Sequence, residues 1–381
     1  MAEPYTWFIG GGETGEIATW IIAISILIST IISIMAFLGI AQSLQIRIWK
    51  GQIESRLRIL ESYVRNTRNL ARKKIEKLGG KNPDELIDLA MDFFVIEPVS
   101  IEPTDIIRRL ERVLRTGEER LEYLVSKYLP SADKVSRSTT ETLLLVVNVL
   151  NTLYKYIRHI LILGVKTRNA MLIAQLWMML PFLMRIAKAY HDAGKAFSQG
   201  LPVGDSIGPL VARKLMQKLP VVKEFSEITK DTAYSVHNYK DRTIIVVKAT
   251  GPGSTVGRPG EAVEKIAKEY AQSLKAIITV DAALKFEGEK TGSIAEGSGV
   301  AMGDPGPEKI RIERIATSLS IPLYAIAIKM GLEEAITAMK KEIAQEADKV
   351  VEKVLKLVDD ITEPGDTVIV VGVGNTVGVA P

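Results

Sequence analysis

Two aspartates in the second half of the chain are placed where carboxyl groups can do acid–base chemistry. Asp205 lies in the segment GDSIGP, where a helix is expected to begin, and Asp281 directly follows the apolar run 277–280. Taken alone, Asp205 suits a helix N-cap and Asp281 suits a turn after a strand. Two carboxyl groups held close together can instead share a proton and activate a water molecule.

Two similar glycine-rich segments follow apolar runs. Residues 251–257 read GPGSTVG, and residues 372–378 read GVGNTVG. Neither segment has the lysine of a phosphate-binding P-loop, and neither fits the glycine spacing of a dinucleotide site. No helix can follow the second segment before the chain ends at Pro381, so nucleotide binding is not favoured. The glycines either shape a binding surface or only permit tight strand exits.

A third glycine-rich segment, residues 288–306, is long enough to be a functional loop. Several acidic residues lie in or beside it, and some of their oxygens would suit a divalent metal: Glu287, Glu289, Glu296 and Asp304. Because the chain has no cysteine and three histidines, thiolate metal sites and a cysteine nucleophile are excluded. We predict a site that uses neither a metal nor a cofactor.

Short β-branched runs alternate with helical stretches from residue 200 onward. The pattern predicts an α/β domain over residues 200–381, with buried parallel strands at 243–248, 276–280, 324–328 and 367–371 and helices at 207–219, 260–273, 309–319 and 332–360. Ligands of such sheets bind beyond the carboxyl ends of the strands. Asp281 and the first two glycine-rich segments follow predicted strands, so they are expected at this edge.

The N-terminal region carries an expected membrane anchor. Residues 17–41 form an uncharged stretch of 25 residues, long enough to cross about 30 Å of hydrocarbon as a helix. The preceding residues 1–16 have no basic side chain, whereas residues 42–80 contain ten basic and three acidic ones. The positive-inside rule therefore predicts a single-pass protein of the cell membrane, with residues 1–16 outside and the C-terminal domain in the cytoplasm.

Residues 42–80 form a basic juxtamembrane segment with apolar residues near a seven-residue repeat, among them Ile53, Leu57 and Leu60. One interpretation is a self-associating coiled coil, and the other is a helix packed on the chain's own cytoplasmic part. The segment accounts for the whole excess of positive charge. This local excess indicates a lipid bilayer as partner and argues against nucleic acid.

A helical subdomain is expected over residues 81–199, with helices at 83–94, 104–128, 139–163 and 167–197. Two apolar stretches, 142–165 and 171–184, fail as second spans because of their charges, length or Pro181. Buried core helices or helices of a homo-oligomer are favoured instead. Met178, Met179 and Met184 are expected to have packing roles.

The α/β segment resembles the spore germination protease. The residues that carry the resemblance are IITVDAAL at 277–284, the glycine-rich loop from 292 to 299, IPLYAIAI at 321–328, and VKATGPG at 247–253 with GRPGE at 257–261. Two further motifs match in the wrong order, because VVGVGN at 370–375 ends the chain while DSIGPLVA at 205–212 begins the domain. Joining the C-terminus to Asp205 restores the family's order, so the domain resembles a circular permutant of this protease.

The resemblance implies a three-layer fold of the phosphorylase/hydrolase-like type, shared with the hydrogenase-maturation proteases. It also implies that Asp205 and Asp281 are catalytic, one as a base toward water and the other as an acid toward the amide nitrogen. The glycine-rich exits would then contact substrate through Gly253, Gly257, Gly297, Gly299, Gly374 and Asn375. His237 is a looser candidate, because it precedes a predicted strand.

The whole chain resembles an archaeal family of single-span membrane proteins, and its composition suits a thermophile. Two functions follow. The first is a membrane-anchored cytoplasmic hydrolase, an aspartate-dependent endopeptidase acting on a peptide or protein substrate. The second is a non-catalytic oligomeric scaffold or ligand-binding protein that uses a protease-like fold.

Overall fold

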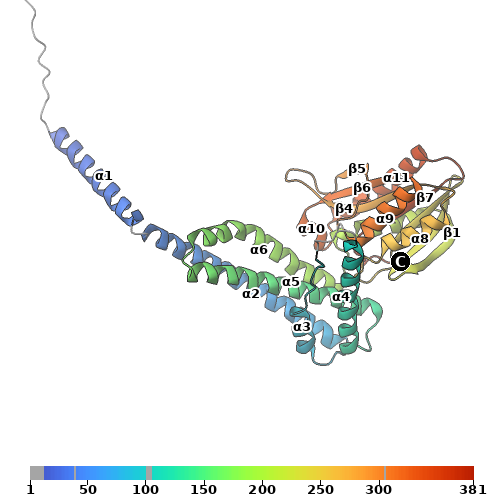
Figure 1. Cartoon of the computed structure of the whole chain (residues 1–381), viewed down its shortest axis with the longest axis horizontal. Helices are drawn as coiled ribbons and strands as arrows, with labels where there is room; N and C mark the ends of the chain where they lie inside the picture. The colour runs from blue at the N-terminus through green and yellow to red at the C-terminus, as the bar shows by residue number, and fades with distance from the viewer. Residues whose placement is uncertain (1–12, 38–39, 100–104, 304–305) are drawn as a thin grey trace, which may run out of the picture. The chain divides into compact units, whose positions relative to one another are not determined.

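The computed structural model describes residues 13–37, 40–99, 105–303 and 306–381. Helices form the described chain up to residue 199, and a mixed α/β domain follows (Figure 1). The helices are α1 Glu13–Phe37, α2 Ile40–Lys77, α3 Pro83–Met91, α4 Ile106–Tyr128, α5 Lys134–Lys166 and α6 Ala170–Gln199. Most of the predicted tail 1–16, and residues 38–39 of the predicted span, lie outside the described residues.

The chain divides into two compact units. The first comprises Met1–Arg58 and Tyr156–Pro181, and the second comprises Ile59–Lys155 and Phe182–Pro381. Within the first unit, Ile53 and Leu57 of α2 are buried, as are Ile157 of α5 and Ile173 of α6. The juxtamembrane helix thus packs on the chain's own helices, which is the second of the two interpretations of its apolar repeat.

One helix of the described residues, Ala170–Gln199, is long and apolar enough to cross a membrane by length and composition, and Ile21–Ile34 is a shorter apolar stretch. Only 28% of the most apolar window of α6 is buried. Met178 and Met179 are 63% and 50% exposed, so the predicted packing role is wrong for these two residues. The reason is that α6 packs through the face that contains Ile173, and no other described residues cover its opposite face.

The α/β domain contains one sheet of seven strands in the order β1-β2-β3-β7-β4-β6-β5. Its strands are β1 Val221–Thr229, β2 Thr232–Tyr239, β3 Arg242–Ala249, β4 Leu274–Leu284, β5 Ile294–Ser298, β6 Leu323–Met330 and β7 Thr367–Gly372. The four predicted strands are β3, β7, β4 and β6, and they pair in parallel. The sheet is nevertheless mixed, because β1, β2 and β5 pair antiparallel.

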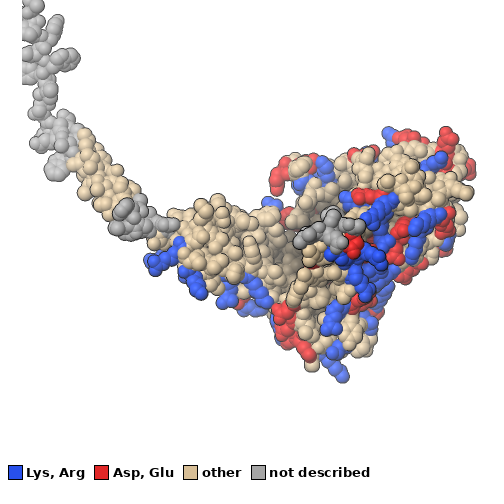
Figure 2. All heavy atoms as spheres, in the orientation of Figure 1, with Lys and Arg blue, Asp and Glu red and all other residues tan. Residues whose placement is uncertain are grey.

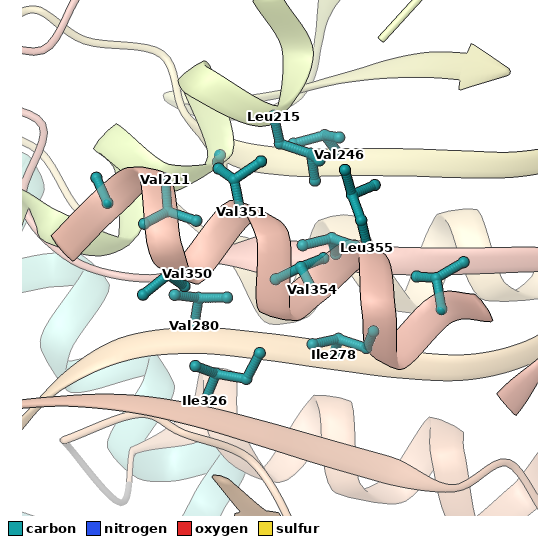
Figure 3. Close-up of a cluster of buried hydrophobic side chains, with 14 of the residues drawn as sticks. Val211, Leu215, Val246, Ile278, Val280, Ile326, Val350, Val351, Val354 and Leu355 are labelled. Carbon is teal, nitrogen blue, oxygen red and sulfur yellow. The ribbon is translucent and has the colours of Figure 1, made fainter. Parts of the chain in front are cut away.

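Helices cover both faces of the sheet. On one face, α7 Ile207–Lys218 and α11 Lys341–Ile361 bury a common core with the strands, including Val211, Val246 and Val354 (Figure 3). On the other face, α8 Pro259–Glu269 and α9 Pro307–Leu319 pack on Ile245 and Ile369. The central strand β7 is buried throughout its length, as expected for a parallel strand covered on both sides.

Two predictions for this domain need correction. The helix expected over 332–360 is divided into α10 Leu332–Ile336 and α11, because Ala338 forms a β-bridge with Val203 and the Met339 N–H donates to the Pro202 carbonyl. The segment 288–306 is not a single loop, since β5 lies within it and pairs with β6. Its residues 304–305 lie outside the described part of the chain.

Candidate functional site

Asp205 is held at the carboxyl ends of the two central strands. It lies in a short 3₁₀ turn, Gly204–Ser206, that leads directly into α7. The next turn approaches both strands closely, because a Cβ on Gly208 would lie 2.0 Å from the Val373 carbonyl oxygen and 2.6 Å from that of Val280. Only glycine permits this approach, which places Asp205 over the ends of β7 and β4.

Asp281 occupies the same edge from within β4. The strand was expected to end at Val280, but it continues to Leu284 because Asp281 and the following residues still pair with β6. Pairing with β7 ends at Val280, opposite Gly372. Asp281 is therefore the first residue of β4 beyond its pairing with β7.

Backbone amides bind both carboxyl groups. The Asn375 N–H donates to Oδ2 of Asp205 at 2.7 Å. Asp281 accepts at Oδ1 from the Ala282 N–H at 2.7 Å and at Oδ2 from the Gly303 N–H at 3.1 Å. Asp205 is thus not capped by amides of its own helix, which was the expectation if its role were only structural.

The pKa values of both carboxyl groups are raised, and Asp205 contributes to the rise at Asp281. Burial, and then the neighbouring Asp205 carboxyl, raise the pKa of Asp281 to about 8. Burial also raises the pKa of Asp205, against the lowering effect of the hydrogen bond from Asn375. Asp281 is 4% exposed, whereas Asp205 keeps part of its surface accessible. Such a pair holds a proton at neutral pH and can act as an acid and a base together.

A polar cleft of about 870 Å³ reaches as far as Asn375, the residue whose N–H binds Asp205, and neither aspartate lines it. Helices α4 and α5 line one wall, the glycine-rich segment 254–258 lines the other, and Asn375 completes it. The Asn375 side chain donates to the Ser254 hydroxyl at 2.9 Å, and the Thr142 hydroxyl donates to the same group at 2.7 Å. Asn375 therefore joins the cleft to Asp205, because its backbone binds that carboxyl while its side chain faces the cleft wall.

The residues expected to contact substrate separate into two groups. Gly257 and Asn375 line the cleft, Gly374 contacts Asp205, and Gly253 lies buried against Ser138 of α5. Gly297 and Gly299 belong to β5 and its exit, which pairs with β6 at the far edge of the sheet. The structure does not bring these last two glycines to the cleft or to the aspartate pair.

Other predicted candidates lie away from the pair. His237 is buried in β2, where its Nε2 lies 2.8 Å from the Ser235 hydroxyl, and β3 and β7 separate it from β4. Glu289 and Glu296 form ion pairs with Lys329 and Lys353, and Glu287 is paired with Arg185. Asp304 lies outside the described residues. No group of three potential metal ligands occurs among the residues that the structure does describe.

Two charged residues were not singled out by the sequence pattern. Glu141 of α5 lines the cleft, and burial, followed by the charge of Glu122, raises its pKa to about 7. Lys248 is fully buried at the end of β3, where it donates to the carbonyl groups of Ala249 and Ala380, and burial lowers its pKa to about 8. The only signal for Lys248 was a single charge at the end of an apolar run, and Glu141, which lies between two threonines, carried no such signal.

The architecture defines a protein with a helical N-terminal part and a C-terminal mixed α/β domain that carries a buried aspartate pair at its central strand ends. Two family models match these parts: the Protein of unknown function (DUF1512) N-terminal domain over residues 27–200, and the Domain of unknown function (DUF1512) C-terminal over residues 203–380. The chain belongs to the DUF1512 family. No curated protein matches it.

Proposed function

We propose that this protein is a membrane-attached hydrolase that cleaves peptide bonds with Asp205 and Asp281. The observation that carries the proposal is the pair itself: two carboxyl groups at the carboxyl ends of the central strands, both with a raised pKa, where the charge of Asp205 contributes to the rise at Asp281. Catalytic carboxyl pairs with a shared proton have this electrostatic character.

The chemistry follows from the difference between the two environments. Asp281 has a pKa raised to about 8 and holds the proton at neutral pH, so it donates to the amide nitrogen as the bond between carbon and nitrogen breaks. Asp205 is the more accessible and takes a proton from the attacking water as the new bond between carbon and oxygen forms. Proton transfer between the two groups then restores the starting state.

The cleft beside Asn375 is the proposed substrate site. Its volume of about 870 Å³ suits a segment of extended peptide, and its walls carry both signs of charge, with Arg258 and Lys230 on one side and Glu141 and Glu122 on the other. Such a lining can bind main-chain amides and charged side chains of a peptide. We therefore expect the cleaved bond to enter from the cleft toward Asp205.

We also propose that the α/β domain is a circular permutant of the spore germination protease fold. The chain's end packs on the start of the α/β domain, because a Cβ on Gly378 would lie 2.6 Å from the Pro202 nitrogen and 2.8 Å from the Gly200 carbonyl oxygen. Ends that meet in this way allow a fold to be cut and rejoined elsewhere without loss of its core. In this interpretation, Asp205 and the segment 370–375 occupy neighbouring positions that a single motif holds in the protease.

We propose that α1 spans the membrane and that the exposed face of α6 lies against the same bilayer. The apolar side chains of Ile21–Ile34 are largely exposed, and so are those of Met171, Met178 and Phe182 along α6. Residues 170–184 carry no charge, whereas Arg47, Lys50 and the basic residues that follow lie along α2 (Figure 2). An apolar face beside basic residues is typical of contact with an anionic bilayer.

Cleavage of a mixed peptide library by the detergent-purified full-length protein tests the proposed activity. We expect Asp205→Asn and Asp281→Asn each to lose about 100-fold or more of the wild-type rate. Asp348→Asn is the matched control, because this exposed aspartate of α11 forms an ion pair with Lys214 and belongs neither to the aspartate pair nor to the cleft lining. Equal rates in all four proteins, or no cleavage by the wild type over a range of pH and temperature, would refute the proposal.

A second candidate function is a non-catalytic membrane scaffold. The observation that favours it is that both oxygens of Asp281 accept N–H groups from adjoining backbone, an arrangement that can simply hold the segment at Gly303 in place. In a scaffold the exposed face of α6 would join copies of the chain. Light scattering in detergent tests this alternative, which predicts a defined oligomer that Met178→Gln disrupts and an absence of peptide cleavage.

A further inference from the structure

The compact unit that contains the proposed substrate cleft has a second cavity, between α4, α8 and α9. Its volume is about 780 Å³. Charged side chains dominate its lining: Arg108, Glu111, Arg112 and Arg115 of α4, Glu264 and Lys268 of α8, and Arg311 and Arg314 of α9. The rest of the lining is mainly apolar and includes Ile107, Ile310 and Ile315. Basic side chains gather over these helices on the face shown in Figure 2. Neither aspartate of the proposed catalytic pair contributes to its lining.

The lining has a large excess of positive charge. It contains six basic and two acidic side chains. Glu111 pairs with Arg115 at 2.5 Å and with Arg311 at 2.9 Å, and Glu264 pairs with Arg311 at 2.8 Å and with Lys268 at 2.7 Å. Arg115, Arg311 and Lys268 thus neutralise both acidic side chains.

Three arginines are left over. Arg108, Arg112 and Arg314 have no acidic partner within the described part of the chain, and all three are exposed at the cavity. Arg108 and Arg112 are four residues apart and lie on the same face of α4. Like charges in one cavity repel one another, so an anion that enters it gains from all three.

Arg311 holds the two helices together and also has a donor to spare. Its Nη2 donates to both carboxylate oxygens of Glu111 at 2.9 Å, which fixes α9 against α4. Its Nε is buried and has no hydrogen-bond partner among the described residues. A buried donor without an acceptor is costly, and an acceptor oxygen in the cavity would satisfy it.

We propose that this cavity binds a small organic phosphate that carries at least two phosphoryl groups. Guanidinium groups match phosphate oxygens with paired hydrogen bonds, and two phosphoryl groups supply charge for the three unpaired arginines. Ile107, Ile310 and Ile315 provide apolar contact for the organic part, and the volume suits a molecule of that size. Among the residues that the structure describes, no aromatic side chain lines the cavity to stack bases, which disfavours single-stranded nucleic acid.

Isothermal titration calorimetry on the full-length protein in detergent tests this site, with adenosine diphosphate and inorganic pyrophosphate as separate probes. We expect saturable binding that weakens as salt is added, and a loss of affinity of about tenfold or more in each of Arg112→Ala and Arg314→Ala. Arg314→Lys keeps the charge but loses the paired geometry, so it should bind with intermediate affinity.

Arg120→Ala is the matched control, because Arg120 is also exposed on α4 but contacts the ring of Tyr123 and does not line this cavity. It should bind as the wild type does, and thermal melting should show that every variant is folded. Tighter binding of the diphosphate than of pyrophosphate would assign the apolar wall to the organic part. Absence of binding with both probes, or equal affinity in the wild type and both alanine variants, would overturn the proposal.

Discussion

Asp281 lies at the end of a strand and carries a buried carboxyl group, and neighbouring residues determine both properties. Its place at the edge of the sheet could be predicted from the sequence, because it follows an apolar run and the carboxyl ends of parallel strands meet at one edge. What the sequence could not predict is the depth of burial, which depends on the segment at Gly303 closing over the carboxyl group. That burial is the main cause of its raised pKa.

The raised pKa predicts a specific dependence of stability on pH. An aspartate in an unfolded chain titrates near about 3.9. Because the folded pKa of Asp281 is about 8, the folded protein keeps a proton that the unfolded chain has lost. Its contribution to stability is therefore full below about pH 4 and is lost as the pH rises to about 8. We expect urea-unfolding free energies of the wild type to fall over this range.

Asp281→Asn should flatten that profile. The amide cannot ionise, so the unfolding free energy of the variant should rise relative to that of the wild type as the pH increases. At low pH it should be the less stable protein, because an amide oxygen cannot accept both N–H groups in their present positions. Unfolding curves measured at pH 4 and pH 8 provide the comparison, and parallel profiles for the two proteins would contradict the assignment of Asp281 as the titrating group.

Gly374 tests how tightly the Asp205 carboxyl is positioned. Its φ of +130° is rare for residues with a side chain, and an added Cβ would lie 2.0 Å from the Asp205 carbonyl oxygen. We expect Gly374→Ala to lower the unfolding free energy by more than about 2 kcal/mol. Gly365→Ala is the matched control, because Gly365 also has a positive φ of +93° but has open space around its Cβ position. Equal losses in the two variants would mean that backbone strain, not the contact with Asp205, sets the cost.

At the scale of whole elements, prediction succeeded for strands with a continuous apolar run and missed β2, which is buried but alternates polar with apolar residues. The four parallel strands were recognisable because each is a continuous run of apolar and β-branched residues, such as Val368–Val371. Strand β1 was missed because it carries Lys223 and Glu224 and is largely exposed. Strand β5 was missed because its glycine and serine residues look like a loop, and pairing with β6 alone makes it a strand.

Helix α6 shows the opposite error. Its apolar sequence predicted burial, yet its outward face finds no partner in the described chain. In a membrane-attached protein, such a face is expected to meet lipid, and Trp49 and Trp177, whose rings lie 5.9 Å apart in the same unit, are of the type enriched at bilayer interfaces. The packed and outward faces of α6 therefore should respond differently to substitution.

Substituting a polar residue on the exposed face of α6, and another on its packed face, shows which face contributes to packing. Met178→Gln should change the unfolding free energy in detergent by less than about 0.5 kcal/mol, because Met178 is 63% exposed. Leu180→Gln should cost about 2 kcal/mol or more, because Leu180 is 4% exposed. Equal costs would mean that the outward face is covered even in detergent.

Lipid contact itself is measured with a fluorophore on Met178→Cys in reconstituted vesicles, which is selective because the chain has no cysteine of its own. Brominated lipids should quench this label and should not quench a label on Lys356→Cys of the α/β domain. Absence of quenching at position 178, with energy transfer between labelled copies, would assign the face to a second copy of the chain.

At the scale of the whole molecule, the proposed function requires one orientation in the membrane. Ten basic residues against three acidic ones over 42–80, and none before residue 42, predict that the tail is outside and the α/β domain is in the cytoplasm. A membrane-impermeant maleimide applied to intact cells should label Glu3→Cys and leave Lys356→Cys unmodified until the cells are lysed. Labelling of Lys356→Cys alone would place the proposed catalytic pair on the outer side.

The protonation of the aspartate pair is the most direct test of the proposed mechanism, because the chemistry needs one carboxyl group to keep its proton at neutral pH. Infrared difference spectra of the wild type, Asp205→Asn and Asp281→Asn should be recorded across a pH titration. The mechanism predicts a protonated carboxyl component at pH 7 in the wild type that disappears near pH 8 and is missing from Asp281→Asn, separate from the component of Glu141, which titrates near pH 7 in all three proteins. In Asp205→Asn the Asp281 component should disappear at a lower pH, because one charge that raises the pKa has been removed. A wild-type protein with no protonated carboxyl group at pH 7 would contradict the proposed acid and base roles.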